Sequence, residues 1–146
     1  MTAIAVTKPS AEFQFRDIRV GTSASFAHDV VEEDVTRFAE LSGDWNPLHV
    51  DTTYAATTEL GRPIVHGMFI GALFSRLVGM FLPGRYSLYL SQTLDFARAC
   101  HVGERLEISG QVLSVHPSSA TVVIQTTAVR DGVTIVRGKA TVRVLR

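Results

Sequence analysis

The sequence predicts an α+β domain in which one antiparallel sheet wraps around a single long helix. Residues 67–82 form the most apolar segment of the chain, and a proline and a glycine follow it directly. The segments after position 86 are rich in β-branched residues that largely alternate with polar ones, as strands do. Asp131 and Gly132, the strongest local turn signal, join the last two of these segments into a hairpin. Covering one apolar helix with such strands is the economical layer arrangement.

Length and composition limit the possible classes of protein. The chain has 146 residues, of which 46% are hydrophobic and 19% are charged, and this suits a single self-sufficient core. We expect a loose N-terminal lead over residues 1–10 and one domain over residues 11–146. The fourteen basic and fourteen acidic residues balance, so the basic stripe that binds nucleic acid is missing. A lone cysteine, Cys100, cannot form an internal disulfide, which fits a reducing cytosol.

The N-terminus and the apolar segment do not indicate secretion or a membrane. The first ten residues lack the basic and apolar regions of a signal peptide. The segment 67–82 is shorter than the ~20 residues that cross a bilayer, and it contains Arg76. Because it is apolar nearly all round, we expect it to be a core helix enclosed on all sides. The protein is therefore expected to be cytoplasmic, with no membrane partner.

Residues 32–42 are expected to form the first helix, after an edge strand at 23–28. Three carboxylates stand in its first turn, where they favour the positive end of the helix dipole. Its N-cap is weak, because the two valines before it have no side-chain acceptor. An apolar stripe recurs along it at helical spacing, at Val31, Val35, Phe38 and Ala39.

A loop and a second, short helix are expected before the central helix. The loop covers residues 43–49, and Asp51 then caps a helix that runs to about position 59, with Gly61 as its stop. A further turn at 116–119 is expected between two strands. The strand segments after the central helix are 87–96, 105–115, 121–130 and 133–145.

The expected loop carries the first candidate for chemistry. Asp44 and His49 stand on either side of Asn46 and Pro47, and neither belongs to an apolar stripe. A carboxylate and an imidazole on one rigid loop can hold one water, with one group withdrawing a proton while the other delivers one. Asn46 can orient either partner, and Pro47 fixes the backbone. From the spacing alone, an Asp-capped turn with a surface histidine is an equal alternative.

The entry to the apolar helix is the second candidate. The sequence VHGM puts Gly67 at a helix N-terminus, where unpaired N–H groups can bind a thioester oxygen. Taken alone, a tight entry to a crowded helix explains this glycine as well. Gly71, Ser75 and Val78 continue the same face. These small residues either leave a groove for a thin apolar chain or let the helix pack closely on the sheet. Ser75 is interpreted as a donor or packing residue, because no base lies beside it in sequence.

Other site types have weaker support. Asp44, His49 and His66 are conceivable metal ligands, but no His or Cys pair has structural-zinc spacing, so we expect no metal. The usual glycine-rich nucleotide signatures do not occur in the sequence. Cys100 beside His101 suggests a thiol–base pair, but we interpret it as coincidence, because neighbouring strand residues point to opposite faces.

The chain resembles the MaoC-like family, the (R)-specific enoyl-CoA hydratases. The segment FAELSGDWNPLH at 38–49 resembles the hydratase-2 motif of that family, and the similarity continues in order through YAATT, RPIVHGM, LPG and SLYL. The resemblance covers about residues 30–110. Within the family, the chain looks most like the short, stand-alone bacterial hydratases that supply (R)-3-hydroxyacyl-CoA for polyhydroxyalkanoate synthesis. The resemblance implies a hot-dog fold, whose strands wrap the central helix, and a homodimer.

The resemblance also assigns roles in the site. These are Asp44 and His49 as the catalytic pair, Gly67 as the backbone donor to the thioester oxygen, and Asn46 and Ser75 as supporting residues. The implied reaction is reversible syn addition of water to a trans-2-enoyl-CoA, giving (R)-3-hydroxyacyl-CoA, so the enzyme would be a hydro-lyase. We expect the aspartate to take the water proton and the histidine to protonate C2, with the reverse assignment open. No cofactor is implied, because coenzyme A is part of the substrate.

Alternative functions remain open, since one fold hosts several activities. They are dehydration of 3-hydroxyacyl groups on a carrier protein in fatty acid or polyketide assembly, an acyl-CoA thioesterase, and a non-catalytic subunit of a hot-dog heterodimer. The intact acid–base pair argues against the last of these. Gly71 and Val78 are the expected acyl-pocket residues. Three arginines are candidates either for the coenzyme phosphates or for plain surface charges: Arg62, Arg85 and Arg98.

Overall fold

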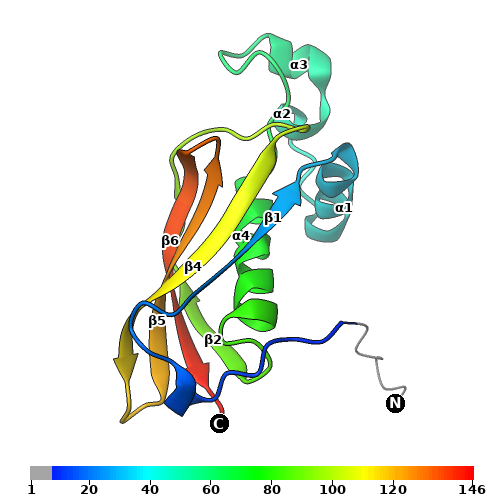
Figure 1. The fold of residues 1–146 in the computed structure, drawn as a ribbon. Helices are drawn as coiled ribbons and strands as arrows, with labels where there is room; N and C mark the ends of the chain where they lie inside the picture. The colour runs from blue at the N-terminus through cyan, green and yellow to red at the C-terminus, as the bar shows by residue number, and fades with distance from the viewer. Residues whose placement is uncertain (1–7) are drawn as a thin grey trace, which may run out of the picture.

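The computed structural model describes residues 8–146, so the first seven residues of the expected N-terminal lead lie outside the described chain. One curved antiparallel sheet lies against the central helix α4 (Gly67–Arg76), which a further helical turn extends, and three other helices gather at one end of the sheet (Figure 1). The predicted α+β class, with an antiparallel sheet packed on one long helix, is confirmed. This arrangement leaves the end of the sheet near the start of α4 to carry the candidate site residues.

The sheet contains six strands. They are β1 (Ser23–Asp29), β2 (Ser87–Gln92), β3 (Asp95–Phe96), β4 (Arg105–His116), β5 (Thr121–Arg130) and β6 (Val133–Val144). Their order is β1-β4-β5-β6-β2, with β3 paired to β6 outside this path. The edge strand and the last three strands agree with the prediction within one residue. The expected single strand at 87–96 is wrong, because pairing with β6 shifts register between Tyr89 and Ser91 and resumes as β3 at Asp95.

Asp131 and Gly132 form the predicted hairpin turn between β5 and β6. Both residues have positive φ angles, 48° and 76°, as a two-residue type I′ turn requires. Arg130 and Val133 pair directly across the turn. The expected turn at 116–119 is also present, between β4 and β5. Both turns keep consecutive strands adjacent, so the predicted order of the last three strands is confirmed.

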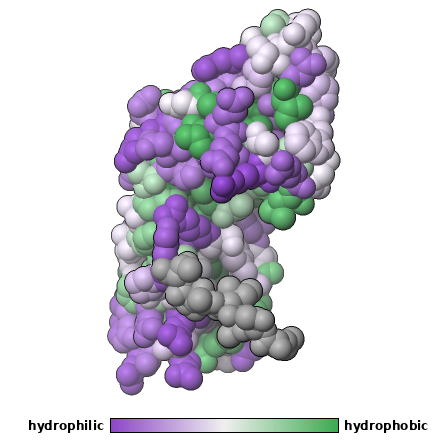
Figure 2. All heavy atoms as spheres, turned by 90° about the vertical axis from the view of Figure 1, so that its right-hand side faces the viewer, coloured by the Kyte–Doolittle hydropathy of each residue, from purple (hydrophilic) through white to green (hydrophobic). Residues whose placement is uncertain are grey.

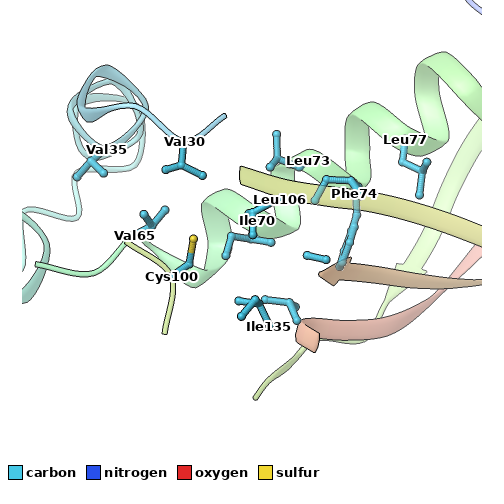
Figure 3. Close-up of a cluster of buried hydrophobic side chains, with 13 residues drawn as sticks. Val30, Val35, Val65, Ile70, Leu73, Phe74, Leu77, Cys100, Leu106 and Ile135 are labelled. Atoms are coloured by element: carbon cyan, nitrogen blue, oxygen red, sulfur yellow. The ribbon is translucent and has the colours of Figure 1, made fainter. Parts of the chain in front are cut away.

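The apolar segment forms α4 and continues as a wider helical turn, η2 (Leu77–Phe81). The expected helix is therefore confirmed, although its last turn is π-helical. Ile70 and Phe74 point from α4 toward the strands in the buried cluster of Figure 3. Phe74 is completely buried there, and its packing anchors the helix on the sheet.

One face of α4 is exposed in the single chain, so the expectation of a helix enclosed on all sides is wrong. Met68, Ala72 and Ser75 lie on that face, and Met68 is 59% exposed. The cause is geometric, because the sheet covers only one side of the helix. Hydrophobic residues reach the surface between polar ones on the side of the molecule that carries the first helix (Figure 2).

The first helix, α1 (Glu32–Ser42), has the predicted bounds. Its N-cap residue Val31 has no capping side chain, as expected. Asp34 compensates for this, because its Oδ2 accepts a hydrogen bond from the Val31 N–H (3.0 Å) and lies 2.9 Å from Nε2 of His28. Two later members of the predicted apolar stripe are buried, whereas Val31 is exposed. The buried stripe therefore begins one turn later than expected.

The segment expected to be a loop over 43–49 contains a helical turn, α2 (Pro47–Val50), so that expectation is wrong for its second half. Asn46 caps this turn, and the proline that follows has the fixed φ that suits a first helical position. The next helix, α3 (Thr52–Ala56), is capped by Asp51 as predicted. It ends three residues earlier than the expected position 59.

The segment before β1 contains one short helical turn, η1 (Phe15–Asp17). Glu12 forms an antiparallel bridge with Gly84, just after η2, so this segment passes the end of α4 that lies far from the short helices (Figure 1). Across residues 8–146, every helix is too short or too polar to cross a membrane.

Candidate active site

Asp44 stands between the end of α1 and the start of α2, at one end of the sheet. Its backbone N–H donates to Oγ of Ser42 (3.1 Å), and its Oδ1 accepts the backbone N–H of Asn46 (3.1 Å). These two bonds fix the residue from both sides. They leave Oδ2 free, and the side chain is 49% exposed. One carboxylate oxygen is thus structural, while the other is available for chemistry.

His49 is held on α2 and not on a flexible loop. Asn46 caps that turn, with its Oδ1 accepting the N–H of Leu48 (2.9 Å). Nδ1 of His49 donates to the carbonyl oxygen of Ile64 (2.8 Å). Because a carbonyl can only accept, this bond assigns the proton of the neutral ring to Nδ1 and leaves a lone pair on Nε2. Asn46 therefore supports the site by placing the histidine, as well as by bonding to Asp44.

The side chains of Asp44 and His49 approach each other across a short gap. Oδ2 of Asp44 lies 3.9 Å from Nε2 of His49. That separation is too long for a direct hydrogen bond, but one oxygen atom between the two can bond to both. The arrangement can hold a water and move its protons, which is what the spacing of the two residues indicated.

His66 is the residue that sequence reasoning did not place among the acid–base groups. Its side chain is 2% exposed, and its ring stacks on that of His49 with centroids 3.9 Å apart and planes inclined by 29°. Nε2 of His66 donates to the backbone carbonyl of Asp44 (2.9 Å). The only signal in the sequence was a histidine directly before the glycine that opens the central helix.

The same three side chains form the cluster considered as metal ligands. Ligand atoms of Asp44, His49 and His66 all lie within 4.8 Å of one another. However, Nε2 of His66 carries a proton that is donated to a carbonyl, so it has no lone pair to offer on this side. Two groups remain, whereas a catalytic zinc takes three protein ligands. The donor set therefore favours acid–base chemistry over metal binding.

Gly67 begins α4 beside this pair. Within residues 8–146 its N–H has no hydrogen-bond acceptor, which leaves it available to a ligand. The ring of Phe96 lies against its Cα, since a Cβ added at this position would lie 2.6 Å from Cε1 of that ring. Gly67 and Phe96 line a cavity of about 400 Å³ together with Leu60, Met68 and Arg98. The backbone donor therefore borders open space, as the carbonyl-binding role needs.

Gly71 and Ser75 line a second cavity, of about 380 Å³, on the exposed face of α4. Leu94 partly fills it and would lie 3.0 Å from a Cβ added at Gly71. Val78 is not among the lining residues of this cavity and is buried in the core between helix and sheet. Gly71 and Ser75 therefore border a cavity, whereas Val78, expected to line the acyl pocket, packs in the core.

Two half-buried polar residues, Tyr89 and Gln92, also line that second cavity. The hydroxyl of Tyr89 donates to Oε1 of Gln92, whose Nε2 donates to Oγ1 of Thr126 (2.9 Å). Burial raises the pKa of Tyr89 to about 12, so it is a neutral phenol at physiological pH. An apolar chain in this cavity would therefore meet two polar side chains in its wall.

The three candidate arginines are in different surroundings. Arg85 pairs with Glu12 (3.1 Å), far from the acid–base pair, and Arg62 lies 3.8 Å from Glu104. In the part of the chain that the structure describes, Arg98 has no carboxylate partner, and it lines the cavity beside Gly67. Arg98 is the one of the three that combines an unpaired charge with a position near the helix entry.

Cys100 is not part of a thiol–base pair. It is 2% exposed, and burial, followed by a hydrogen bond to Glu104, raises its pKa to about 12. Such a thiol remains protonated and unreactive in the folded protein. Cys100 and His101 lie outside any strand, so the expected reason for their independence was wrong, although the conclusion agrees with the burial of the thiol.

Known proteins resemble most of this chain in sequence and in fold. A family model described as the MaoC like domain matches residues 6–134. An (R)-specific enoyl-CoA hydratase of Aeromonas caviae is 37% identical over 88% of this chain and 96% of its own length. One of Rhodospirillum rubrum is also 37% identical, over 89% and 90%. The solved structure of an R-hydratase of Pseudomonas aeruginosa superimposes with a TM-score of 0.86 at 34% identity, covering 92% of this chain and 87% of that one. The predicted hot-dog fold is thereby confirmed.

Proposed function

Since the chain belongs to the MaoC-like family, we propose that it is an (R)-specific enoyl-CoA hydratase, a hydro-lyase that adds water reversibly to a trans-2-enoyl-CoA. One observation carries the proposal: Oδ2 of Asp44 and Nε2 of His49 stand 3.9 Å apart, and neither atom makes a hydrogen bond to residues 8–146. Two relatives named (R)-specific enoyl-CoA hydratase align with 88% and 89% of this chain. The proposal treats residues 11–146 as one catalytic domain.

The thioester oxygen binds to the N–H of Gly67 in this proposal. That hydrogen bond draws electrons from the conjugated double bond toward the carbonyl and makes C3 electrophilic. The position of Gly67 at the first turn of α4 adds the positive end of the helix dipole to the effect. The acyl chain then extends toward the cavity that Gly71 and Ser75 line.

The acid–base pair completes the addition. Asp44 takes one proton of the bound water while the water oxygen bonds to C3. For this step His49 holds a second proton, on the Nε2 that has a lone pair in the neutral ring, and it gives this proton to C2, whose new C–H bond uses the electrons of the former double bond. Nδ1 of His49 keeps its bond to Ile64 throughout. Transfer of the proton from Asp44 to His49 restores the starting state. Because both groups act from one side, the addition is syn.

Arg98 is proposed to bind phosphate groups of coenzyme A. It lines the cavity next to Gly67 and has no carboxylate partner among the described residues, and both observations support a role in binding an anion. Arg98→Ala should raise KM for crotonyl-CoA and leave KM for crotonyl-pantetheine unchanged. Arg85→Ala is the matched control, because that arginine is paired with Glu12 far from the site. An equal effect of both variants on crotonyl-CoA would contradict the assignment.

The active form is proposed to be a homodimer. Met68 on α4 and Phe96 on β3 expose 59% and 53% of their surface, and β2 is an edge strand with unpaired backbone groups. A second copy paired along this edge would cover them. Light scattering on the purified protein should give twice the chain mass.

The buried, free Cys100 supports the expected cytoplasmic location.

The test of the function is a hydration assay with three substrates. With crotonyl-CoA, the conjugated enoyl absorbance should fall and (R)-3-hydroxybutyryl-CoA should accumulate. Butyryl-CoA should release no free thiol, whereas a thioesterase would release it. Crotonyl groups on an acyl-carrier protein should react more slowly than the CoA ester. No loss of enoyl absorbance from a folded dimer would overturn the proposal.

A further inference from the structure

We propose that His66 is a positioning residue that keeps Asp44 and His49 at the separation that the reaction needs. The inference rests on the proposed hydratase function. His66 directly precedes α4 and is 22 residues from Asp44 in sequence, yet it contacts both members of the pair. With 2% of its side chain exposed, it reaches the substrate only through them.

The first contact fixes the backbone of Asp44. Nε2–H of His66 donates to the carbonyl oxygen of that residue (2.9 Å), and this bond ties the turn after α1 to the residue directly before α4. Oδ1 of the same aspartate is held by the N–H of Asn46 (3.1 Å). With a backbone atom and one carboxylate oxygen fixed, Oδ2 has a defined position relative to the N–H of Gly67.

The second contact fixes the ring of His49. Its edge is held by the bond from Nδ1 to Ile64, and its face lies on the ring of His66 at 3.9 Å between centroids. Phe38 packs against His66 in turn, with centroids 4.9 Å apart. The stack therefore limits the tilt of the His49 ring. It thereby fixes the distance between Nε2 of His49 and Oδ2 of Asp44, which is 3.9 Å. Geometric precision of this kind is worth a large factor in rate.

A stability cost accompanies this arrangement. Nδ1 of His66 is buried and has no hydrogen-bond partner among the residues that the structure describes. A buried acceptor left unpaired destabilises a fold. A phenylalanine would occupy similar space without that lone pair, so packing alone does not explain a histidine here. The residue is therefore better explained by its contacts with the acid–base pair.

The test compares two substitutions that each keep one contact. His66→Phe keeps a ring under His49 but has no donor for Asp44, whereas His66→Gln keeps an N–H donor but has no ring. Each should lower kcat for crotonyl-CoA by about 10- to 100-fold, with KM close to the wild-type value. The melting temperature of the phenylalanine variant should stay close to that of the wild type, because the unpaired acceptor is removed together with the lost bond.

The matched control is His28→Phe. That histidine also has a polar partner, Oδ2 of Asp34 at 2.9 Å, and an aromatic neighbour, Phe69, but it touches neither member of the pair. This variant should keep the wild-type kcat. If His28→Phe loses as much kcat as the His66 variants, the loss does not depend on contact with the acid–base pair. That result would overturn the inference.

A double variant shows whether His66 acts through His49. His49→Ala with His66→Phe should lose less kcat than the product of the two single losses, because the part of the His66 effect that acts through the His49 ring is already absent. The inference is overturned by a fully multiplicative loss, by wild-type kcat in both His66 variants, or by loss of folding in both. A wild-type protein without hydratase activity would instead refute the proposed function.

Discussion

Oδ2 of Asp44 lies 3.9 Å from Nε2 of His49, across a gap that neither side chain closes. The opposite atom of each group is engaged, since Oδ1 of the aspartate accepts the Asn46 N–H and Nδ1 of the histidine donates to Ile64. Both facing atoms can therefore bind the same water. The rigid parts of the site hold the two groups apart, and that separation is what permits water to enter between them.

Gly67→Ala should disturb both the fold and the reaction. The added Cβ would lie 2.6 Å from Cε1 of Phe96, so that ring must move from the wall of the cavity. We expect a loss of about 1–3 kcal/mol in the free energy of unfolding, measured by urea denaturation, together with a lower kcat/KM. Adding Phe96→Ala removes the clash and should restore most of the stability. If the double variant is no more stable than the single one, the Phe96 contact is not the cause.

Asp34→Ala should destabilise the protein through the start of α1. Oδ2 of Asp34 is the acceptor for the otherwise uncapped Val31 N–H (3.0 Å), and loss of such a cap costs about 1 kcal/mol. Glu33→Ala, in the same turn, is the control, because its carboxylate pairs only with the exposed Arg37. Chemical denaturation should separate the two variants, and equal stabilities would contradict a capping role.

Glu104 should make the free energy of unfolding fall as the pH becomes acidic. Burial raises its pKa, but hydrogen bonds from Arg130 (2.7 Å) and the His101 N–H (3.1 Å), with smaller help from Cys100 and the Arg130 charge, outweigh this and lower the pKa below 4.5. A group with a lowered pKa in the folded state stabilises above its unfolded pKa and loses this contribution as pH falls through its folded pKa.

Glu104→Gln should be less stable than the wild type at pH 7, and the difference should shrink as the pH falls below 4.5. Unfolding free energies measured over this range check it. A difference that stays constant down to the acid limit would mean that the ionised carboxylate contributes nothing.

Local signals were sufficient for much of the fold. The apolar repeat and acidic first turn predicted α1 with its observed bounds, and the Asp131-Gly132 pair predicted the β5–β6 hairpin. In both cases residues close in sequence decide the structure. The Asn46-Pro47 pair is also a local signal, an N-cap followed by a first helical residue, and it could have predicted α2 where a loop was expected.

Features that depend on distant residues could not be predicted. The contact of His66 with Asp44 spans 22 residues and exists only because α2 and the start of α4 meet at one end of the sheet. The division of β2 from β3 depends on register against β6, and the exposed face with Met68 depends on how far the sheet curves. Single-sequence periodicity contains none of this.

The central claim is most directly tested by the hydration rate of crotonyl-CoA for Asp44→Asn and His49→Ala. Asparagine keeps the acceptor for the Asn46 N–H but cannot take the water proton, so each variant should lose about 10²–10⁴-fold in kcat while remaining folded. Asp51→Asn, which keeps the cap of α3, is the control and should match the wild type. Wild-type kcat in either folded site variant would contradict the shared-water mechanism.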